Sequence, residues 1–454
     1  MKYLGRALIA GIAIVGGGYL VADAWDVVPG FLTVKSQVEE PESFPSVADV
    51  EAKTYSLPTY DSAAKAPNPD AVAQVIKAFG EDYRVTGDIS MLVYDAETGD
   101  QLGSLNPSRG TLPASNMKIV TAAAALEGLG PDTTFPTTTE LDGSALYLVG
   151  GGDVWLAPNG AETITGLPRA GMKDLADATA AKLKAEGVSS VSVTVDATLF
   201  AAPLFHVDNV GVNSTYVMQM RPIALERSRW QGGGYTNNPH LSAAQVFADH
   251  LAEAGIEVTG IDSGAAPSSA KEISRIESAP VREIVDFMLV NSDNTTAEVL
   301  AHLLAVKQGR PASFTGAAAA VTEQMENEGY PMSNVVISDS SGLVDSNRIT
   351  AALLVEILKR TWQCDGCDLA AMSAGFPVGG LDGTLWDRFH DTEIEGQVRA
   401  KTGTLIQANS LSGFLVTDAG RPLIFSIMID NIEEGTTASA RPAIDDVLQE
   451  IAKL

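Results

Sequence analysis

The chain has 454 residues and a mass of 47.5 kDa, which at roughly 150 residues per domain predicts two or three domains and excludes a single small module. Its 57 acidic and 30 basic residues give a net charge of −27, so nucleic acid and anionic lipid are excluded as main partners because both would be repelled. With 45% hydrophobic and 19% charged residues, the composition is that of a globular protein and excludes global disorder.

The N-terminal segment has the pattern of an export signal. Lys2 and Arg6 precede an uninterrupted apolar run at 7–22, which is short for a membrane span and typical of a signal-peptide core. The small-x-small sequence at 22–24 is typical of a cleavage site. Because the apolar character continues beyond it, we expect residues 1–32 to be either a cleaved signal peptide or an uncleaved membrane anchor. Both alternatives place the rest of the chain outside the cytoplasm.

The segment after the export signal predicts a linker and then the start of a folded domain. Residues 33–69 are rich in Pro, Ser, Glu and Ala and show no sustained periodicity, which is typical of a linker. We expect folded sequence from about residue 70. Strand, turn and strand patterns follow over 89–105, and a helical pattern over 114–126.

β-rich runs return near the C-terminus, at 395–401, 411–417 and 423–429, before an amphipathic helical pattern at 441–454. Strand pairs therefore stand at both ends of the folded part, with helical patterns such as 281–289 between them. This arrangement predicts an α+β fold in which one antiparallel sheet is built from distant halves of the sequence and is flanked by helices.

The middle of the chain differs from both ends in composition and in its predicted elements. It contains short Thr-rich strand patterns and two helix–glycine–strand units, at 173–195 and 242–258. We therefore expect an inserted smaller α/β lobe at 133–276, and a main domain assembled from residues 70–132 and 277–454.

The sequence S-N-M-K at 115–118 opens the predicted helix. A serine hydroxyl is a weak nucleophile and needs a base within hydrogen-bond reach. Because positions i and i+3 share one face of a helix, the Lys118 amine would lie beside the Ser115 hydroxyl, where the helix N-terminus favours developing negative charge. S-x-x-K also occurs at 62–65 and 268–271, but only the Ser115 copy opens an apolar helical run.

The sequence S-D-N at 292–294 follows the helical pattern at 281–289. The Ser292 hydroxyl could pass a proton to a leaving amine, and the Asn294 amide could orient Lys118 and hold a substrate carbonyl. S-x-N is common by chance and recurs at 104–106, so a solvated helix end is the alternative interpretation.

The sequence K-T-G-T at 401–404 ends a β-rich run and is the only K-[ST]-G in the chain. Lys401 at a strand edge could hold a substrate carboxylate, Gly403 would let a substrate backbone lie close, and the Thr404 backbone N–H could face an oxyanion. The alternative is a turn after an edge strand.

All three motifs occur in one order, each with the local structure that its chemistry requires. With them, the chain resembles the penicillin-binding proteins, and within these the low-molecular-mass class C D-alanyl-D-alanine carboxypeptidase/endopeptidase group, serine peptidase family S13. The resemblance covers roughly residues 75–454 and implies a serine β-lactamase/transpeptidase-like fold. Further matching stretches are Gly150-Gly151-Gly152-Asp153, Asp339-Ser340-Ser341-Gly342-Leu343 with Asn347-Arg348-Ile349-Thr350, Leu381-Asp382-Gly383-Thr384-Leu385, and residues 398–405.

The resemblance implies the following reaction. Ser115, deprotonated by Lys118, attacks the D-Ala-D-Ala bond of a peptidoglycan stem peptide, or a D-Ala–meso-diaminopimelate cross-link, and β-lactams inhibit by acylating the same serine. The backbone N–H groups of Ser115 and Thr404 hold the oxyanion, and Ser292 and Asn294 act as above. The terminal carboxylate would be bound by Lys401, Thr402, Gly403 and Thr404, and no metal or organic cofactor is expected.

Two other functions remain open. A β-lactamase would share the three motifs, but its characteristic E-x-x-x-N element is not found in the expected context, and 177 residues separate Ser115 from Ser292, a gap that fits the insertion of the resembled group. A peptidoglycan-binding scaffold without turnover would also keep the fold, although the intact motifs disfavour it.

Several residues outside the motifs leave alternatives open. Asp153 could meet a cation on the third stem-peptide residue or could cap a glycine-rich turn. Arg388 could contact substrate or pair with a neighbouring carboxylate such as Asp387 or Asp391. The two cysteines, Cys364 and Cys367, are expected to form a local disulfide in an exported chain, with a zinc or redox site as the alternatives.

Overall fold

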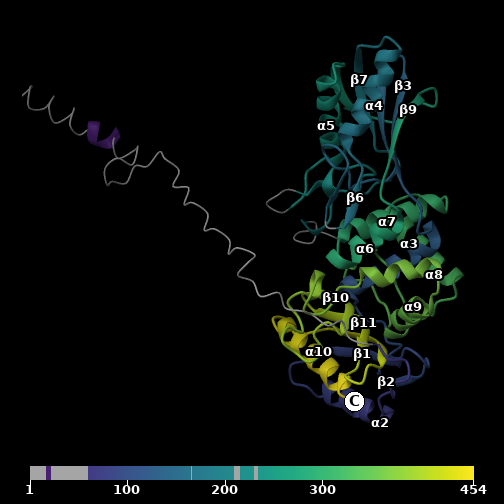
Figure 1. The fold of residues 1–454 in the computed structure, drawn as a ribbon, viewed down its shortest axis with the longest axis vertical. Helices are drawn as coiled ribbons and strands as arrows, with labels where there is room; N and C mark the ends of the chain where they lie inside the picture. Colours follow the sequence, from purple (N-terminus) through teal and green to yellow (C-terminus); the bar gives the residue numbers. More distant parts are fainter. Residues whose placement is uncertain (1–16, 22–59, 165, 209–214, 230–233) are drawn as a thin grey trace, which may run out of the picture. The chain divides into compact units, whose positions relative to one another are not determined.

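The computed structural model describes residues 17–21, 60–164, 166–208, 215–229 and 234–454 (Figure 1). The chain divides into two units, Met1–Ser56 and Leu57–Leu454, and the fold below is that of the second unit. The predicted export segment lies outside the described residues except for a helical turn at 17–21, and so does most of the predicted linker. Within the described part of the chain, no helix is long and apolar enough to cross a membrane.

The first sheet is antiparallel throughout and has the strand order β10-β11-β12-β1-β2. Strands β1 and β12 pair in its middle, with Met91 opposite Ile427. The predicted antiparallel sheet from distant halves of the sequence is therefore confirmed. The bounds of its strands are β1 (Asp88–Asp95), β2 (Gln101–Leu105), β10 (Val398–Leu405), β11 (Ala408–Val416) and β12 (Pro422–Asp430).

Two apolar cores cover the two faces of this sheet. In β12 the odd-numbered Phe425 and Ile427 pack into one core, and the even-numbered Ile424 and Met428 pack into the other. Because successive side chains of a strand point to opposite faces, β12 is apolar at nearly every position. The helices α2 (Pro69–Gly80) and α10 (Thr437–Ala452) contribute to the core that contains Phe425 and Ile427, which is called the first core below.

The second core is helical and surrounds α3 (Met117–Leu129), which is buried along almost its whole length. This helix shows almost no amphipathic pattern because other helices surround it, and small alanines at 122–125 let them approach closely. The surrounding helices are α6 (Val281–Asn291), α7 (Asn294–Lys307), α8 (Phe314–Asn327) and α9 (Ala351–Gln363).

A second sheet takes all its strands from residues 136–277 and has the order β8-β7-β4-β3-β9. Its β4, β7 and β8 are parallel, and two helices pack on it around Phe247 and Leu183. This is the α/β pattern expected for the middle of the chain, while the lobe boundaries 133 and 276 stay a prediction. The elements are β3 (Pro136–Asp142), β4 (Ala145–Gly150), α4 (Met172–Ala185), β7 (Ser190–Asp196), α5 (Pro239–Glu253), β8 (Glu257–Ser263) and β9 (Lys271–Glu277), with a small hairpin of β5 (Glu162–Ile164) and β6 (Leu167–Arg169).

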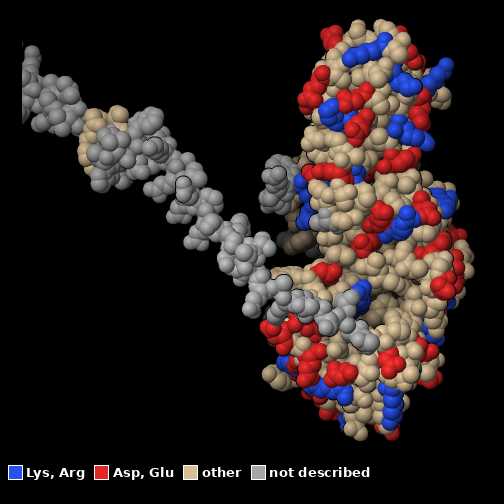
Figure 2. All heavy atoms as spheres, viewed as in Figure 1, with Lys and Arg blue, Asp and Glu red and all other residues tan. Residues whose placement is uncertain are grey.

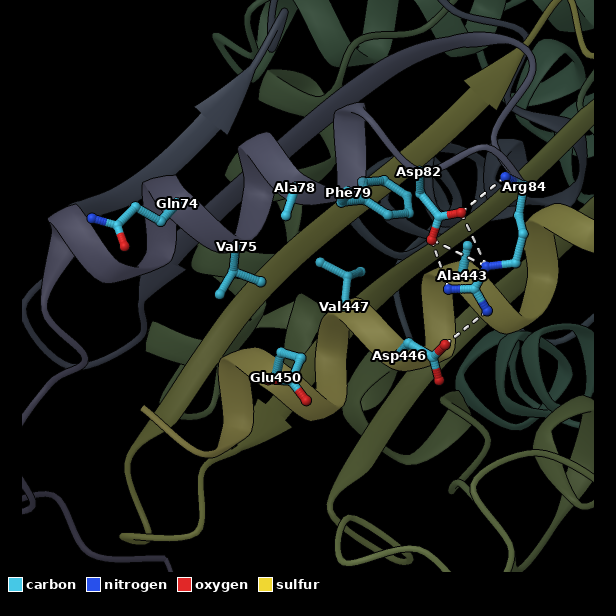
Figure 3. A pocket seen from close by; sticks show the side chains of 10 residues that line it. All are labelled: Gln74, Val75, Ala78, Phe79, Asp82, Arg84, Ala443, Asp446, Val447 and Glu450. Carbon is cyan, nitrogen blue, oxygen red and sulfur yellow. Dashed lines mark hydrogen bonds and ion pairs between the residues drawn. The ribbon is translucent and has the colours of Figure 1, made fainter.

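A cavity of about 380 Å³ lies between α2 and α10, on the outer face of the first sheet (Figure 3). Its floor is apolar, with Phe79 and Val447 facing each other across it. Arg84 closes one end by pairing with Asp82 at 2.6 Å and with Asp446 at 2.8 Å. This cavity belongs to the α2–α10 layer, and the three sequence motifs lie elsewhere.

Candidate active site

Ser115 and Lys118 meet at the start of α3. Residues Ala114–Asn116 form a 3₁₀ turn that runs directly into the helix, so the i and i+3 side chains share one face. The Lys118 amine lies 3.1 Å from the Ser115 hydroxyl oxygen. Lys118 is fully buried, whereas Ser115 is partly exposed, as a nucleophile that must meet a substrate has to be.

The Lys118 amine has three oxygen partners. Besides Ser115, it donates to Asn294 Oδ1 at 2.7 Å and to the Ser341 carbonyl at 2.6 Å. An ammonium group donates three hydrogen bonds and fills all three contacts. A neutral amine has two N–H donors and one lone pair, and the two carbonyl oxygens can only accept. The lone pair is therefore left for the Ser115 hydroxyl, which is the geometry of a general base.

The environment of Lys118 also favours the neutral form. Burial lowers its pKa from 10.5 to about 8, although the negative charges of Asp339, Asp293 and Glu298 act in the opposite direction. A lysine with this pKa is partly unprotonated near neutral pH and can accept a proton from a serine.

The Ser341 carbonyl is fixed by the loop to which it belongs. Glu298 Oε1 accepts from the backbone N–H groups of Ser340 and Ser341, at 3.0 and 2.8 Å. The Asp339 carboxylate accepts from the next three backbone N–H groups, those of residues 342–344. Thr121 of α3 donates to the Ser340 carbonyl at 2.6 Å. The loop therefore presents one carbonyl to the amine with little freedom to move.

The second motif lies at the junction of α6 and α7. Ser292 ends α6 in the left-handed conformation, with φ 54°, and Asp293 begins α7 by accepting from the Thr296 N–H at 2.8 Å. Asn294 uses both ends of its amide, because Oδ1 accepts from Lys118 and Nδ2 donates to the Tyr216 carbonyl at 3.0 Å. The structure thus brings Asn294 to Lys118 as predicted from the sequence.

The third motif lies on β10, which is an edge strand. The segment 377–379 covers the first half of this edge, since Gly379 N–H donates to the Val398 carbonyl and Ala400 N–H donates to the Pro377 carbonyl. In an antiparallel ladder, alternate residues direct both backbone groups outward, so Thr402 and Thr404 do the same beyond this cover. The Thr404 N–H consequently points out of the sheet edge, where an oxyanion donor is needed.

Gly403 lies against the start of α3. A Cβ at this position would be 2.8 Å from the Ser115 nitrogen and 2.3 Å from Ser410 Oγ. Asn116 also joins the two elements, since its amide donates to the Lys401 carbonyl at 3.1 Å and to Ser410 Oγ at 2.7 Å. Only a residue without a side chain lets β10 and the Ser115 turn come this close.

Lys401 is fully buried and donates to the Thr402 carbonyl at 2.8 Å. Burial lowers its pKa well below 10.5, and the nearby charge of Lys118 lowers it further. Thr402 Oγ1 lies 2.8 Å from Thr384 Oγ1, which belongs to the stretch 381–385 noted in the sequence. The third motif therefore brings a second lysine close enough to be affected by the charge of Lys118 and pairs the Thr402 hydroxyl with that of Thr384.

Asp153 and Arg388 are not part of this cluster. Asp153 is buried and caps its own turn by accepting from the Trp155 N–H at 2.9 Å, and burial raises its pKa to about 7. Arg388 is buried and pairs with Asp445 of α10, while the neighbouring Asp387 pairs with Arg441. Both side chains show the contacts of the structural alternatives, with Asp445 as the partner of Arg388, while a contact of either with substrate stays a prediction.

Cys364 and Cys367 form a disulfide directly after α9, with their Cα atoms 5.5 Å apart. Among the described residues, no group of three or more His, Cys, Asp or Glu could hold a metal ion. The cysteine pair therefore closes a local turn at a helix end.

Sequence reasoning missed three contributors to the site: the Ser341 carbonyl, Glu298 and Thr121. A backbone carbonyl has no sequence signature of its own, although the stretch 339–343 was noted as matching. A buried glutamate within an apolar helical run, as Glu298 is in α7, was the one signal that could have identified a partner for this loop.

Comparisons with known proteins identify the family to which the chain belongs. The model of the D-Ala-D-Ala carboxypeptidase 3 (S13) family matches residues 72–231 and 233–451. Carboxypeptidase DacB of Mycolicibacterium smegmatis is 33% identical over 375 residues, which cover 79% of each chain. A D-alanyl-D-alanine carboxypeptidase of Actinomadura sp. is 28% identical over 452 residues and 82% of each chain.

The fold is that of a solved relative. The crystal structure of penicillin-binding protein 4 from Haemophilus influenzae matches 82% of this chain and 99% of its own, with a TM-score of 0.67 and 17% sequence identity. The fold class expected from the motifs is therefore confirmed. The chain belongs to the D-Ala-D-Ala carboxypeptidase 3 (S13) family, the serine hydrolases of the penicillin-binding-protein type.

Proposed function

We propose that this chain cleaves the D-Ala-D-Ala bond of peptidoglycan stem peptides through an acyl-enzyme on Ser115, and that β-lactams acylate the same serine. The observation that carries the proposal is the arrangement around Lys118, where two carbonyl oxygens leave the amine lone pair to the Ser115 hydroxyl. Family membership supplies the substrate class. A β-lactam complex of the Haemophilus influenzae protein, with a TM-score of 0.63 to this chain, supports the inhibitor.

Acylation follows from the geometry. The Ser115 hydroxyl proton passes to the Lys118 amine while the oxygen attacks the scissile carbonyl, whose oxygen becomes negative between the N–H groups of Ser115 and Thr404. As the tetrahedral intermediate collapses, Ser292 gives its proton to the leaving D-alanine nitrogen and takes up the proton held by Lys118, and the C–N bond breaks. Water then attacks the ester, releasing the acyl group and returning the proton to Ser115.

The third motif orients the substrate. An extended peptide can add to the free half of the β10 edge, where Thr402 and Thr404 point their backbone groups outward. The terminal carboxylate would then lie at Lys401 and the Thr402 hydroxyl. Although burial lowers the pKa of Lys401, the negative charge of an arriving carboxylate favours the protonated amine and offsets that effect.

A covalent-labelling experiment tests the proposal. Purified protein is incubated with a fluorescent penicillin, and the adduct is detected after denaturation. We expect stoichiometric label on the natural sequence and none on Ser115→Ala. Ser268→Ala is the matched control, because Ser268 and Lys271 repeat the S-x-x-K pattern outside the site, and it should label fully. Equal label on Ser115→Ala would refute the assignment of the nucleophile.

Product analysis separates the remaining functions. Release of D-alanine from a pentapeptide indicates a carboxypeptidase, and conversion of cross-linked muropeptide dimers to monomers indicates an endopeptidase acting on the D-Ala–meso-diaminopimelate bond. Rapid nitrocefin turnover would favour the β-lactamase alternative, and labelling without any product would favour the scaffold.

The location of this substrate implies export. Peptidoglycan lies outside the cytoplasmic membrane, and the basic-then-apolar pattern of residues 1–32 is that of a secretory signal or anchor. We propose that the chain works in the cell envelope, with cleavage near residue 24 deciding between a released and a tethered protein.

A further inference from the structure

Three successive residues near the active site hold an unfavourable backbone conformation. Glu226, Arg227 and Ser228 have φ values of 50°, 55° and 57°, in the left-handed region that residues with a side chain avoid. Backbone hydrogen bonds hold this segment in place, because Glu226 N–H donates to the Leu156 carbonyl at 3.0 Å and Arg227 N–H donates to the Val154 carbonyl at 2.7 Å. Such strain persists only where its surroundings enforce it, and it is common at functional sites.

The strained segment directs one side chain at the second motif. Arg227 Nη1 donates to Asp293 Oδ2 at 2.5 Å, and its guanidinium carbon lies 4.6 Å from the centre of the Phe287 ring. The Asp293 side chain is 4% exposed and that of Arg227 19%, so water screens the pair little. Asp293 and Phe287 belong to the helix junction that carries Ser292 and Asn294.

Asp293 is thereby held at both carboxylate oxygens. Its Oδ1 accepts from the N–H and the hydroxyl of Thr296, at 2.8 and 2.9 Å, which starts α7. Its Oδ2 takes the Arg227 guanidinium. With both oxygens bound, the side chain cannot rotate, and the two residues on either side of it, Ser292 and Asn294, keep their directions.

Other contacts between the middle of the chain and α7 converge on the same turn. Met218 N–H donates to Thr295 Oγ1 at 3.0 Å, and the Trp155 indole donates to Thr296 Oγ1 at 3.1 Å. The Tyr216 carbonyl accepts from Asn294, as described above. Arg227 is the one among these partners that brings a charge.

We propose that Arg227 is a positioning residue of the active site, which holds Asp293 and with it the directions of Ser292 and Asn294. The proposal rests on the function proposed above. If Arg227 has this role, the middle region of the chain helps to position the catalytic groups. The guanidinium comes from a strained segment that residues 154–156 hold in place.

Arg227 also sets the charge around the base. The groups that face Lys118 are the carboxyl groups of Asp293, Asp339 and Glu298, together with the Lys401 amine. Tyr235, with Arg229 beside it, is a further group that faces Asp293. Removing the Arg227 charge leaves the Asp293 charge uncompensated, and this raises the pKa of Lys118. The pH at which the acylation rate rises from its low value in acid should then be higher.

Saturation kinetics with a fluorescent penicillin test the proposal on Arg227→Met and Arg227→Lys. For Arg227→Met we expect the acylation rate constant to fall about tenfold or more while the binding constant changes less than about threefold, because misplaced groups act on the chemical step. The midpoint of the pH dependence of the acylation rate should rise by about half a pH unit or more. Arg227→Lys, which keeps the charge, should hold the midpoint near its natural value.

Two further variants make the result decisive. Arg227→Met combined with Asp293→Asn removes both charges and keeps a helix-capping side chain, so the midpoint should return toward the natural value. Arg421→Met is the matched control, since Arg421 forms a pair with Asp95 at 2.8 Å that is more deeply buried than the Arg227–Asp293 pair, and it should lower only the melting temperature.

A folded Arg227→Met protein with natural acylation rate and midpoint would overturn the proposal. Failure of the natural sequence itself to label would instead refute the proposed function.

Discussion

The hydrogen-bond partners of the buried Lys118 amine determine the direction of its lone pair. Its amine has no exposed surface, and each of its three partners is an oxygen. Two of these oxygens belong to carbonyl groups and can never donate, so the neutral amine has a single orientation. Burial then makes the neutral form available near physiological pH by lowering the pKa to about 8.

The pH dependence of acylation follows from this pKa. Below about pH 8 the amine is protonated and has no lone pair, so the rate of penicillin labelling should rise as pH increases and level off above about pH 9. Stopped-flow measurement between pH 5.5 and 9.5 would show the midpoint. Lys118→Arg keeps the positive charge but cannot act as a base, and its rate should fall about a hundredfold or more at every pH. A profile that is flat across this range would contradict the assignment of Lys118.

At the scale of elements, the site depends on the close contact of a helix start with a strand edge. The turn that carries Ser115 rests on β10 at Gly403, and the segment 377–379 stops covering the strand just before Lys401. The free half of the edge therefore begins where the nucleophile lies. In the proposed reaction, this arrangement would give a substrate strand backbone partners and an oxyanion donor from the same element.

Replacing Gly403 by alanine tests this contact. The new Cβ would lie within 2.3 to 2.9 Å of Ser410, Ser115 and Pro113 atoms, two of which are backbone, so β10 and the turn must separate. A shift of this size should lower acylation about a hundredfold while the circular dichroism spectrum stays unchanged. Gly260→Ala in β8, where nothing lies within 4 Å of the added atom, is the control and should label at the natural rate. Natural labelling of Gly403→Ala would show that the contact is looser than described.

At the scale of the whole molecule, the net negative charge opposes the approach of the proposed substrate. The chain carries a net charge of −27, and acidic side chains are spread over the visible face of the described part with fewer basic ones between them (Figure 2). The proposed substrate carries carboxylates too. Lys401 supplies local positive charge once a bound carboxylate favours its protonated form, but the field outside the site repels an anionic polymer.

Salt should therefore accelerate the digestion of intact cell-wall polymer. Raising the salt concentration from about 20 to 200 mM shortens the screening distance severalfold, and we expect polymer digestion to speed up several times. A small, neutral stem-peptide analogue should change less than about twofold under the same conditions, which makes it the internal control. Equal responses of the two substrates would indicate that the net charge has no part in substrate approach.

The sequence by itself determined the class of fold and predicted the catalytic set that we propose. The local rules behind this are strong. S-x-x-K at a helix start puts Ser115 and Lys118 on one face, and β-rich runs indicate the strands at both ends of the folded part. The order of the three motifs then predicted that Asn294 and Lys401 would join them, and the structure places Asn294 on the Lys118 amine.

Only the tertiary structure decided the contacts that depend on long-range packing. The Ser341 carbonyl, Glu298 beneath it and Arg227 beside Asp293 come from segments far apart in the chain, and no local pattern specifies which of them will meet. It also decided the contacts of Asp153 and Arg388. Asp153 caps a buried turn and Arg388 pairs with Asp445, and both contacts depend on the complete fold. The spacing of residues along the chain determines which side chains share a face of one helix or strand. Contacts between distant segments form only when the whole core packs.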